Sequence, residues 1–402
     1  MAKRNRVIYQ SEALFVSAQY SGGKTIDIID GSHQAAGVNP SMATGDFHQI
    51  HRVQSANYNF AISRTDVNQF GNLARIDSAI IEAPTVGLDF SFLVTDGSNE
   101  DKLGITVDDS HEMSAISGIL SNVSGRNYHI VTTAEGTDAN VDRFAEGAGD
   151  LANKSQATTS TIISIGNGFV TNYSMNAAIG SIPSASVSVE GLNITAQPSH
   201  AGAITTPAMN SSNSTAGTAT FVLPQPESGH VGDILRPGDM EINLNDATGL
   251  LANFADTAAR NSAHIQSFSI DVPLGRSVLN RLGNAFGFSK EIDFPVTVSC
   301  SISAIVADLK AGNLFNELYS TDKHDMQIVM RKPAAGGGSA GAEQIRYKLK
   351  GVVLDSESFS SSIGDNKTVD LSFSATVGGP EDVTNGLFIS GSPISVSQKA
   401  SS

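Results

Sequence analysis

Residues 84–97 read PTVGLDFSFLVTDG, and their apolar and polar side chains alternate with the period of a β-strand. One face carries Val86, Leu88, Phe90, Phe92 and Val94, and the other carries Thr85, Gly87, Asp89 and Ser91. The Asp96-Gly97 pair at the end of the stretch indicates a turn. This stretch therefore predicts a strand with one face in a core and one face toward solvent.

The same alternation recurs on both sides of this stretch. Residues 53–62, VQSANYNFAI, predict a half-buried strand, and residues 162–194 predict a long β-hairpin. Apolar residues at helical spacing in 111–122 and 246–258 predict one short helix in each half of the chain.

A second copy of the pattern begins 212 positions later. The segment RTDVNQFGN, residues 64–72, aligns with RSVLNRLGN, residues 276–284. The identical pairs are Arg64 and Arg276, Asn68 and Asn280, Gly71 and Gly283, and Asn72 and Asn284. Farther along, residues 179–180 and 363–364 are both Ile-Gly, at an offset of 184. The parity is preserved as well, and a slip of one residue would turn every side chain to the other face. Chance resemblance between alternating strands explains the shared parity, but it explains the four identities and the repeated order of elements less well, so we favour duplication.

These patterns predict a mainly β protein with two tandem β-sandwich or barrel modules, each flanked by a short α-helix. We expect the first module in residues 1–195 and the second in residues 227–382. Residues 196–226 are rich in Ser, Thr, Ala and Gly, which is typical of a linker or surface loop. Residues 383–402 are expected to form a C-terminal tail.

Composition narrows the class of protein. Among 402 residues, 40 are acidic and 25 are Lys or Arg, giving a net charge of −15 that disfavours sequence-specific nucleic-acid binding. The single cysteine, Cys300, lies in an alternating stretch and is expected in the core. Basic residues open the chain, but Gln10, Ser11 and Glu12 interrupt the apolar residues next to them, so we expect no export signal. No stretch reaches the ~18 apolar residues of a membrane helix, so we expect a soluble protein.

Motifs for catalysis or metal binding are present only as fragments. The segment SGGKT, residues 21–25, lacks the first glycine of a phosphate loop, and GGSAG, residues 337–341, lies in a glycine-rich stretch expected to be a hairpin loop. His48 and His51 lack a third ligand, and DGSNED, residues 96–101, lacks the remaining ligands of a calcium loop and is expected to be a solvated turn. We therefore predict no enzymatic activity, no catalytic residue, no metal site and no cofactor.

Two longer stretches carry a family resemblance. YNFAISRTDVNQFGNLARIDSAIIEAPTVGLDFSFLVTDGSNEDKLGI and FVTNYSMNAAIGSIPSASVSVEGLNI resemble the tail-tube (major tail) proteins of long-tailed bacteriophages. The similarity covers residues 53–106 and 168–194, with a weaker copy over about 265–378. It lies in the order of strands and in the Gly and Pro positions between them.

The resemblance implies two packed antiparallel sheets with a helix at one flank. It also implies rings of six tube domains, stacked into a tube through which DNA and the tape-measure protein pass without specific DNA binding. With two domains per chain, the ring would be a homotrimer that is pseudo-hexameric. The expected location is the virion tail, after synthesis in the host cytoplasm, with this chain itself, the tape-measure protein and other tail proteins as partners. The alternatives are a sheath or baseplate-hub protein and a surface β-domain adhesin.

A tube of this kind needs a polar bore. The polar faces of the predicted strands supply the candidates, which are Asp89, Ser91, Ser186, Ser188 and Glu190 in the first copy and Asp370 and Ser372 in the second. Acidic and hydroxyl groups would repel or tolerate DNA phosphates rather than bind them. Whether these residues line the lumen or the exterior stays open from sequence.

Overall fold

The computed structural model describes residues 12–18, 25–26, 47–82, 84–108, 113–121, 125–132, 161–198, 203–205, 207, 220–222, 234–244, 263–280, 282–283, 289–306, 323–333, 341–360, 368–379 and 382–391. Strands dominate these residues, and helices are few and short. The prediction of a mainly β protein is confirmed.

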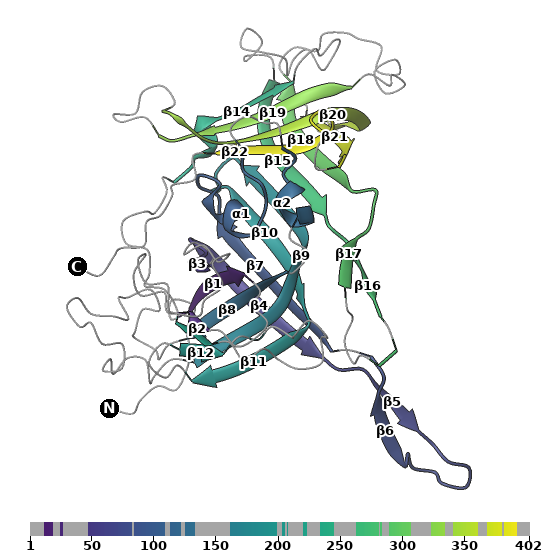
Figure 1. The fold of residues 1–402 in the computed structure, drawn as a ribbon. Coiled ribbons are helices and arrows are strands. Elements are labelled where there is room, and N and C mark those ends of the chain that lie inside the picture. The colour runs from purple at the N-terminus through teal and green to yellow at the C-terminus, as the bar shows by residue number, and fades with distance from the viewer. Residues whose placement is uncertain are drawn as a thin grey trace, which may run out of the picture.

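Eight antiparallel strands form what we call the central sheet (Figure 1). The first half contains β4 (Val53–Ala61), β7 (Thr85–Leu93), β10 (Ser184–Gly191) and the C-terminal part of β9 (Thr161–Ala178). The second half contains β15 (Ala263–Pro273), β18 (Thr297–Val306), β21 (Thr368–Thr376) and the C-terminal part of β20 (Glu343–Ser360). The strand order is β4-β7-β10-β9-β15-β18-β21-β20, so β9 and β15 join the two halves.

Each half also has a flanking sheet built on the N-terminal part of its longest strand. In the first half β9 continues into a sheet with β11 (Asn193–Pro198), β8 (Arg126–Thr132), β1 (Glu12–Ala18) and β3 (Phe47–Gln49). In the second half β20 continues into a sheet with β22 (Gly386–Gly391), β19 (His324–Arg331) and β14 (Met240–Leu244). The two 18-residue strands therefore pass from one layer to the other.

Smaller elements complete the fold. Two helices, α1 (Ser98–Lys102) and α2 (Ser117–Ser121), lie between β7 and β8. One hairpin, β5 (Arg64–Val67) with β6 (Asp77–Ile80), projects from the body, and its counterpart is β16 (Arg276–Leu279) with β17 (Ser289–Ile292) (Figure 1). A small sheet contains β2 (Thr25–Ile26), β12 (Ala203–Thr205) and β13 (Thr220–Val222), and a 3₁₀ turn, η4 (Pro237–Asp239), precedes β14.

The core lies between the central sheet and the flanking sheets. Leu88, Phe90 and Phe92 of β7 are buried, as the alternation of residues 84–97 predicts, and they share one hydrophobic cluster with Leu14 of β1. The cluster runs on without a break into the second half. Cys300 belongs to it at 1% exposure, with its Sγ 3.7 Å from Sδ of Met326, so its prediction as a core residue is confirmed.

Strand register repeats between the halves at the two offsets found in the sequence. Tyr58 pairs with Leu88, and 212 positions later Ile270 pairs with Cys300. Val187 pairs with Tyr173, and 184 positions later Leu371 pairs with Glu357. The bulges repeat as well: the one between Val53 and Ser55 returns between Ile265 and Ser267, and the one after Ser188 returns after Ser372. Bulges are specific local features, so their repetition is stronger evidence of equivalence than alternation is.

Several expected boundaries differ from the structure. The end of the first module, expected at 195, falls inside β11, because residues 193–198 complete a flanking sheet by pairing with β9. The segment 383–402 is not only a tail, because Leu387, Phe388 and Ile389 bury their side chains in β22. The expected linker contributes β12 and β13. The helix expected over 111–122 is confined to α2, and the one over 246–258 lies outside the described residues.

Candidate functional site

The polar face of the central sheet carries all seven residues singled out as candidates for a lumen. None of them is buried, and each alternates with core-facing neighbours on its strand. They lie on β7, β10 and β21 and are Asp89, Ser91, Ser186, Ser188, Glu190, Asp370 and Ser372. The structure therefore places them on one face, and it leaves their role in an assembly as a prediction.

Pairing across strands extends this face into rows of small polar side chains. One row crosses seven adjacent strands and consists of Ser55, Ser91, Ser186, Ser174, Asp271, Ser299 and Ser374. A second row crosses the joint between the halves and consists of Asn176, Ser269, Ser301, Ser372 and Ser356. Neither row contains Lys or Arg, so these rows offer hydroxyl, amide and carboxylate groups only.

Hydrogen bonds within the face satisfy some of these groups. The Ser188 hydroxyl donates to Oδ1 of Asp89 at 2.6 Å, and the Ser55 and Ser91 hydroxyls lie 2.7 Å apart. Glu190 differs from the other candidates because its Oε1 lies 2.7 Å from Nζ of Lys290 on β17. Its charge is therefore neutralised locally, and the negative charge of the face rests mainly on aspartates.

The joint between the halves combines a backbone ladder with side-chain contacts. Seven residues of β15, from Ser267 to Pro273, pair with β9, and the Leu274 amide donates to the Thr171 carbonyl at 2.8 Å. The Arg276 guanidinium stacks over the Phe169 ring at 4.6 Å. Lys290, whose side chain is 3% exposed, forms its ion pair with Glu190 across the same joint. Burial lowers the pKa of Lys290, and the contact with Glu190 opposes that shift.

The two ends of the central sheet have no ladder partner among the described residues. At one end β4 pairs only with β7, and at the other the C-terminal part of β20 pairs only with β21. An unpaired edge strand presents a row of backbone donors and acceptors that can pair with another chain. In the described part of the chain, the central sheet thus ends at each side in a strand with one ladder partner, and we call these two strands its open edges.

The repeat-defining residues map onto the two hairpins. Arg64 and Arg276 open β5 and β16, and Asn68 and Asn280 directly follow those strands. Asn72 donates its backbone N–H to the Gln69 carbonyl at 3.1 Å, while its counterpart Asn284 lies outside the described residues.

The backbone conformation explains why glycine occupies the same position in both copies of this motif. Gly71 has a φ of 94° and Gly283 a φ of 89°, a left-handed conformation that side chains with a Cβ rarely adopt. The first hairpin's tip exposes Phe70 and Leu73 fully, and the second tip exposes Leu282. Both hairpins therefore turn at the same point and present apolar side chains to solvent.

A buried polar cluster was not predicted from the sequence. Residues 96–101 were expected to be a solvated turn, and that prediction is wrong, because most of them form α1 against the core and Glu100 is 0% exposed. The Tyr173 hydroxyl of β9 donates to Oε1 of Glu100 at 3.0 Å, and the Tyr347 hydroxyl of β20 does so at 3.3 Å. The two hydroxyls lie 2.9 Å apart. This cluster ties α1 to strands from both halves of the chain.

Burial raises the pKa of Glu100 to about 7, with hydrogen bonds from both tyrosines opposing the shift. Oε2 of Glu100 has no hydrogen-bond partner among the described residues. Nothing in the letters DGSNED separates Glu100 from the neighbouring carboxylates. The burial of Glu100 therefore became apparent only in the structure.

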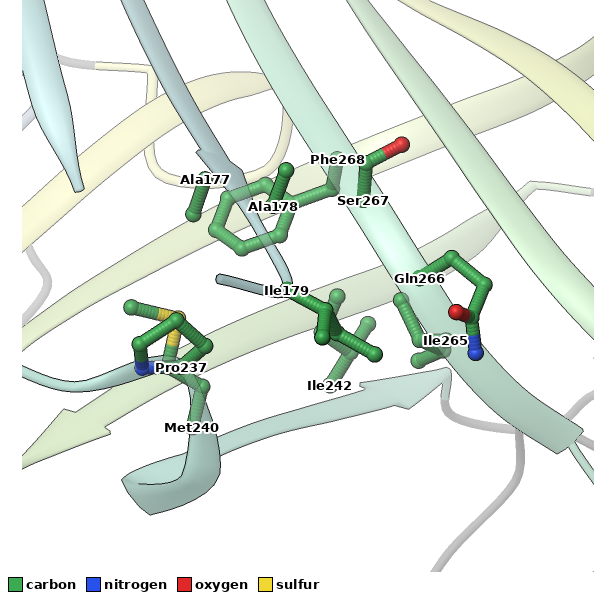
Figure 2. A pocket seen from close by; sticks show the side chains of 10 residues that line it. All are labelled: Ala177, Ala178, Ile179, Pro237, Met240, Ile242, Ile265, Gln266, Ser267 and Phe268. Atoms are coloured by element: carbon green, nitrogen blue, oxygen red, sulfur yellow. The ribbon is translucent and has the colours of Figure 1, made fainter. Parts of the chain in front are cut away.

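A shallow pocket lies at the joint, where the end of β9 meets β14 and β15 (Figure 2). Apolar side chains including Ile179, Met240 and Phe268 make up most of its described lining, to which Gln266 and Ser267 add polar side chains. None of the described residues that line it has a titratable side chain. Within the described part of the chain, no group of three or more His, Cys, Asp or Glu residues could hold a metal ion, and no helix is long and apolar enough to cross a membrane.

Comparison with known proteins gives little further guidance. No protein-family model matches this chain, and no curated protein does. Among solved structures, a type VI secretion system effector from Yersinia pestis is similar at 13% identity, covering 38% of this chain and 98% of that chain, with a TM-score of 0.20. A structure described as Hcp protein is similar at 12% identity, covering 38% of this chain and 97% of that chain, with a TM-score of 0.21. These likenesses are too weak to assign a fold family or a function.

Proposed function

We propose that this chain is a structural subunit of a tube, namely a phage tail tube, and that it acts by assembly rather than by catalysis. The observation that carries the proposal is the central sheet. It is continuous across two equivalent halves, and among the described residues the strand at each of its ends pairs on one side only. A chain of this form can bind another copy of itself at either edge of the sheet.

Closure of such additions would give a finite ring. Contacts that join one end of a subunit to the opposite end of the next generate closed rings when the rotation permits. Closure also removes both open edges, which addresses the aggregation hazard of a long unpaired strand. With two halves per chain, three chains would supply six equivalent units, and the ring would be threefold and only approximately sixfold.

The polar face is the candidate lumen. The central sheet passes directly from half to half, while the two flanking sheets are built on different strands and pair with each other nowhere along the described ladders. The central sheet, in which the two halves pair directly, is the layer best suited to the inner and therefore smaller circumference of a ring. Its free face, with Asp89, Asp271 and Asp370 among serines, would repel DNA phosphates and let DNA pass without binding.

The proposal is tested by electron microscopy of the purified full chain, together with its mass in solution by light scattering. We expect rings or stacked tubes with a central channel, and a soluble ring mass of three times the 41.9 kDa chain. Monomers alone at all concentrations and salt conditions would contradict the proposal. Rings with a different number of chains would contradict only the trimeric stoichiometry.

A further inference from the structure

We propose that the β4 edge of one chain joins the β20 edge of a second copy in the register that β9 and β15 use within the chain, with Tyr58 opposite Phe359 and Phe60 opposite Glu357. The inference rests on the proposed ring function and adds the partner surface and its exact alignment.

The alignment follows from the repeated register. Within the chain, Ile270 pairs with Met175 and Val272 pairs with Tyr173. Subtracting 212 from the residue numbers of β15 gives their equivalents in β4, and adding 184 to those of β9 gives their equivalents in β20. The ladders inside the two halves show the same two offsets. The pair Ile270–Met175 then becomes Tyr58–Phe359 between chains.

Equivalent residues of the two halves differ in burial along these strands. The core-facing Ile270 and Val272 of β15, and Leu274 just after it, are 0%, 2% and 1% exposed. Their counterparts are Tyr58 and Phe60 of β4 and Ile62 just after it, and these are 47%, 46% and 38% exposed. Three apolar side chains in a stripe along an open strand are what an interface leaves uncovered in the isolated subunit.

The β20 edge shows the matching difference. Met175 and Tyr173 of β9, which contact the second half, are 0% and 1% exposed. Their counterparts Phe359 and Glu357 on β20 are only half-buried. As whole residues, Phe359 and Glu357 are therefore less buried than Met175 and Tyr173, although the two carboxylate oxygens of Glu357 are themselves buried.

The β4 backbone already has the shape of the joined strand. Gln54 donates its Nε2 to the Arg52 carbonyl at 3.1 Å, and 212 positions later Gln266 donates to the His264 carbonyl at 3.1 Å. Both bonds lie at the equivalent bulge. Because β15 holds this shape while paired to β9, β4 needs no rearrangement to accept a strand.

The joint between chains would continue the polar face. In the same register Asn57 lies opposite Ser360 and Asn59 opposite Ser358, as Ser269 lies opposite Asn176 and Asp271 opposite Ser174 within the chain. A partner that pairs here therefore extends the rows of small polar groups. This commits the edge to a second copy of the chain.

One difference distinguishes the joint between chains from the joint within the chain. Lys290 and Glu190, which pair across the joint within the chain, have Ser78 and Ser374 as their counterparts. At these positions the joint between chains has no ion pair. Its association should therefore depend little on salt at this site and mainly on apolar contact and backbone pairing.

The register is tested by disulfide trapping in the full chain. The double variant Asn57→Cys with Ser360→Cys, oxidised at ring-forming concentration, should give dimers and trimers on non-reducing gels that dithiothreitol collapses. The matched control, Asn57→Cys with Ser356→Cys, displaces one thiol by four residues, roughly 13 Å along the strand, which a disulfide cannot span. The variant Ser269→Cys with Asn176→Cys should close within one chain and give no ladder.

Outcomes separate this inference from the proposed function. Rings that form without trapping at Asn57 and Ser360, or that trap equally in the displaced control, would overturn the register while leaving the ring intact. A second variant, Phe60→Asp, should stay folded by circular dichroism and remain monomeric, because it places a carboxylate opposite Glu357. Its control, Ile76→Asp, changes a side chain on the hairpin that is 50% exposed and should still form rings. Ring formation by Phe60→Asp would count against the edge as the interface.

Discussion

The buried carboxyl of Glu100 should oppose the pH dependence that a second buried group gives to stability, and a single substitution should reveal this balance. Burial raises its pKa from 4.5 to about 7, so the folded state holds this proton more tightly than the unfolded chain does. The resulting stabilisation is fully present below pH 4.5 and is lost as pH rises through 7. Between pH 5 and pH 8.5 the expected loss is about 2.5 kcal/mol, from 1.36 kcal/mol per pKa unit.

A second buried group opposes this change. His129 lies between the hydroxyls of Ser17 and Ser164 at 3.2 Å and 2.8 Å, and burial lowers its pKa to about 3. Its stabilisation is present above pH 6.5 and lost as pH falls toward 3, which removes about 2 kcal/mol at pH 5 relative to pH 8.5. The two contributions nearly cancel in the wild-type chain, so its stability should change little between these pH values.

Glu100→Gln removes one side of that balance. The variant should gain about 2 kcal/mol between pH 5 and pH 8.5, where the wild type stays nearly flat. Chemical denaturation followed by far-ultraviolet circular dichroism measures this, since the chain has no Trp for fluorescence. The exposed Glu82→Gln serves as the control and should match the wild type. If Glu100→Gln and the wild type change in parallel, Glu100 does not carry the proton.

Other features of the fold give sharper or simpler tests. The Cys300 thiol, buried and with its pKa raised by burial to about 12, should resist Ellman's reagent in the native protein and react with one equivalent in guanidinium; rapid native reaction would contradict its burial. Phe373→Ala should cost about 3–5 kcal/mol of unfolding free energy, while the fully exposed Phe70→Ala should cost less than about 0.5 kcal/mol; equal losses would refute the assigned core. Gly283→Ala should cost about 1 kcal/mol, because its Cβ meets no neighbour but its φ is positive; a neutral result in denaturation would argue against the strained turn.

The sequence predicts the strands well where alternation and burial coincide. Residues 84–97 and 184–191 face the core and solvent as their letters indicate, because a strand's period of two determines the face of each side chain. The equivalence of the two halves was also visible at constant offsets. Neither pattern reveals which strands become neighbours, so the direct pairing of β9 with β15 was found only in the structure.

The failures have a shared cause. Glu100 was missed because a run of polar letters is normally solvated, and only packing of α1 against two distant tyrosines buries it. The strand β22 was missed because a short apolar run near a chain end resembles a tail. It is buried because the Asp108 and Ala115 amides from the first half donate to its Ile389 and Leu387 carbonyls.

The strongest evidence for an interface comes from equivalent residues that are similar in type but buried in one half of the chain and exposed in the other. Covering Tyr58, Phe60 and Ile62, each now about half exposed, would contribute roughly 1 kcal/mol apiece, and each new backbone hydrogen bond about 0.5–1.5 kcal/mol. These gains are comparable to the roughly 4–15 kcal/mol that association costs in lost motional freedom. One such joint is therefore marginal by itself. The last joint of a ring forms between ends that are already held close and costs far less, so closed rings should outcompete open dimers. The open edges expose an isolated chain to aggregation. They are thus too weak to join chains at random, but they are strong enough to close a ring.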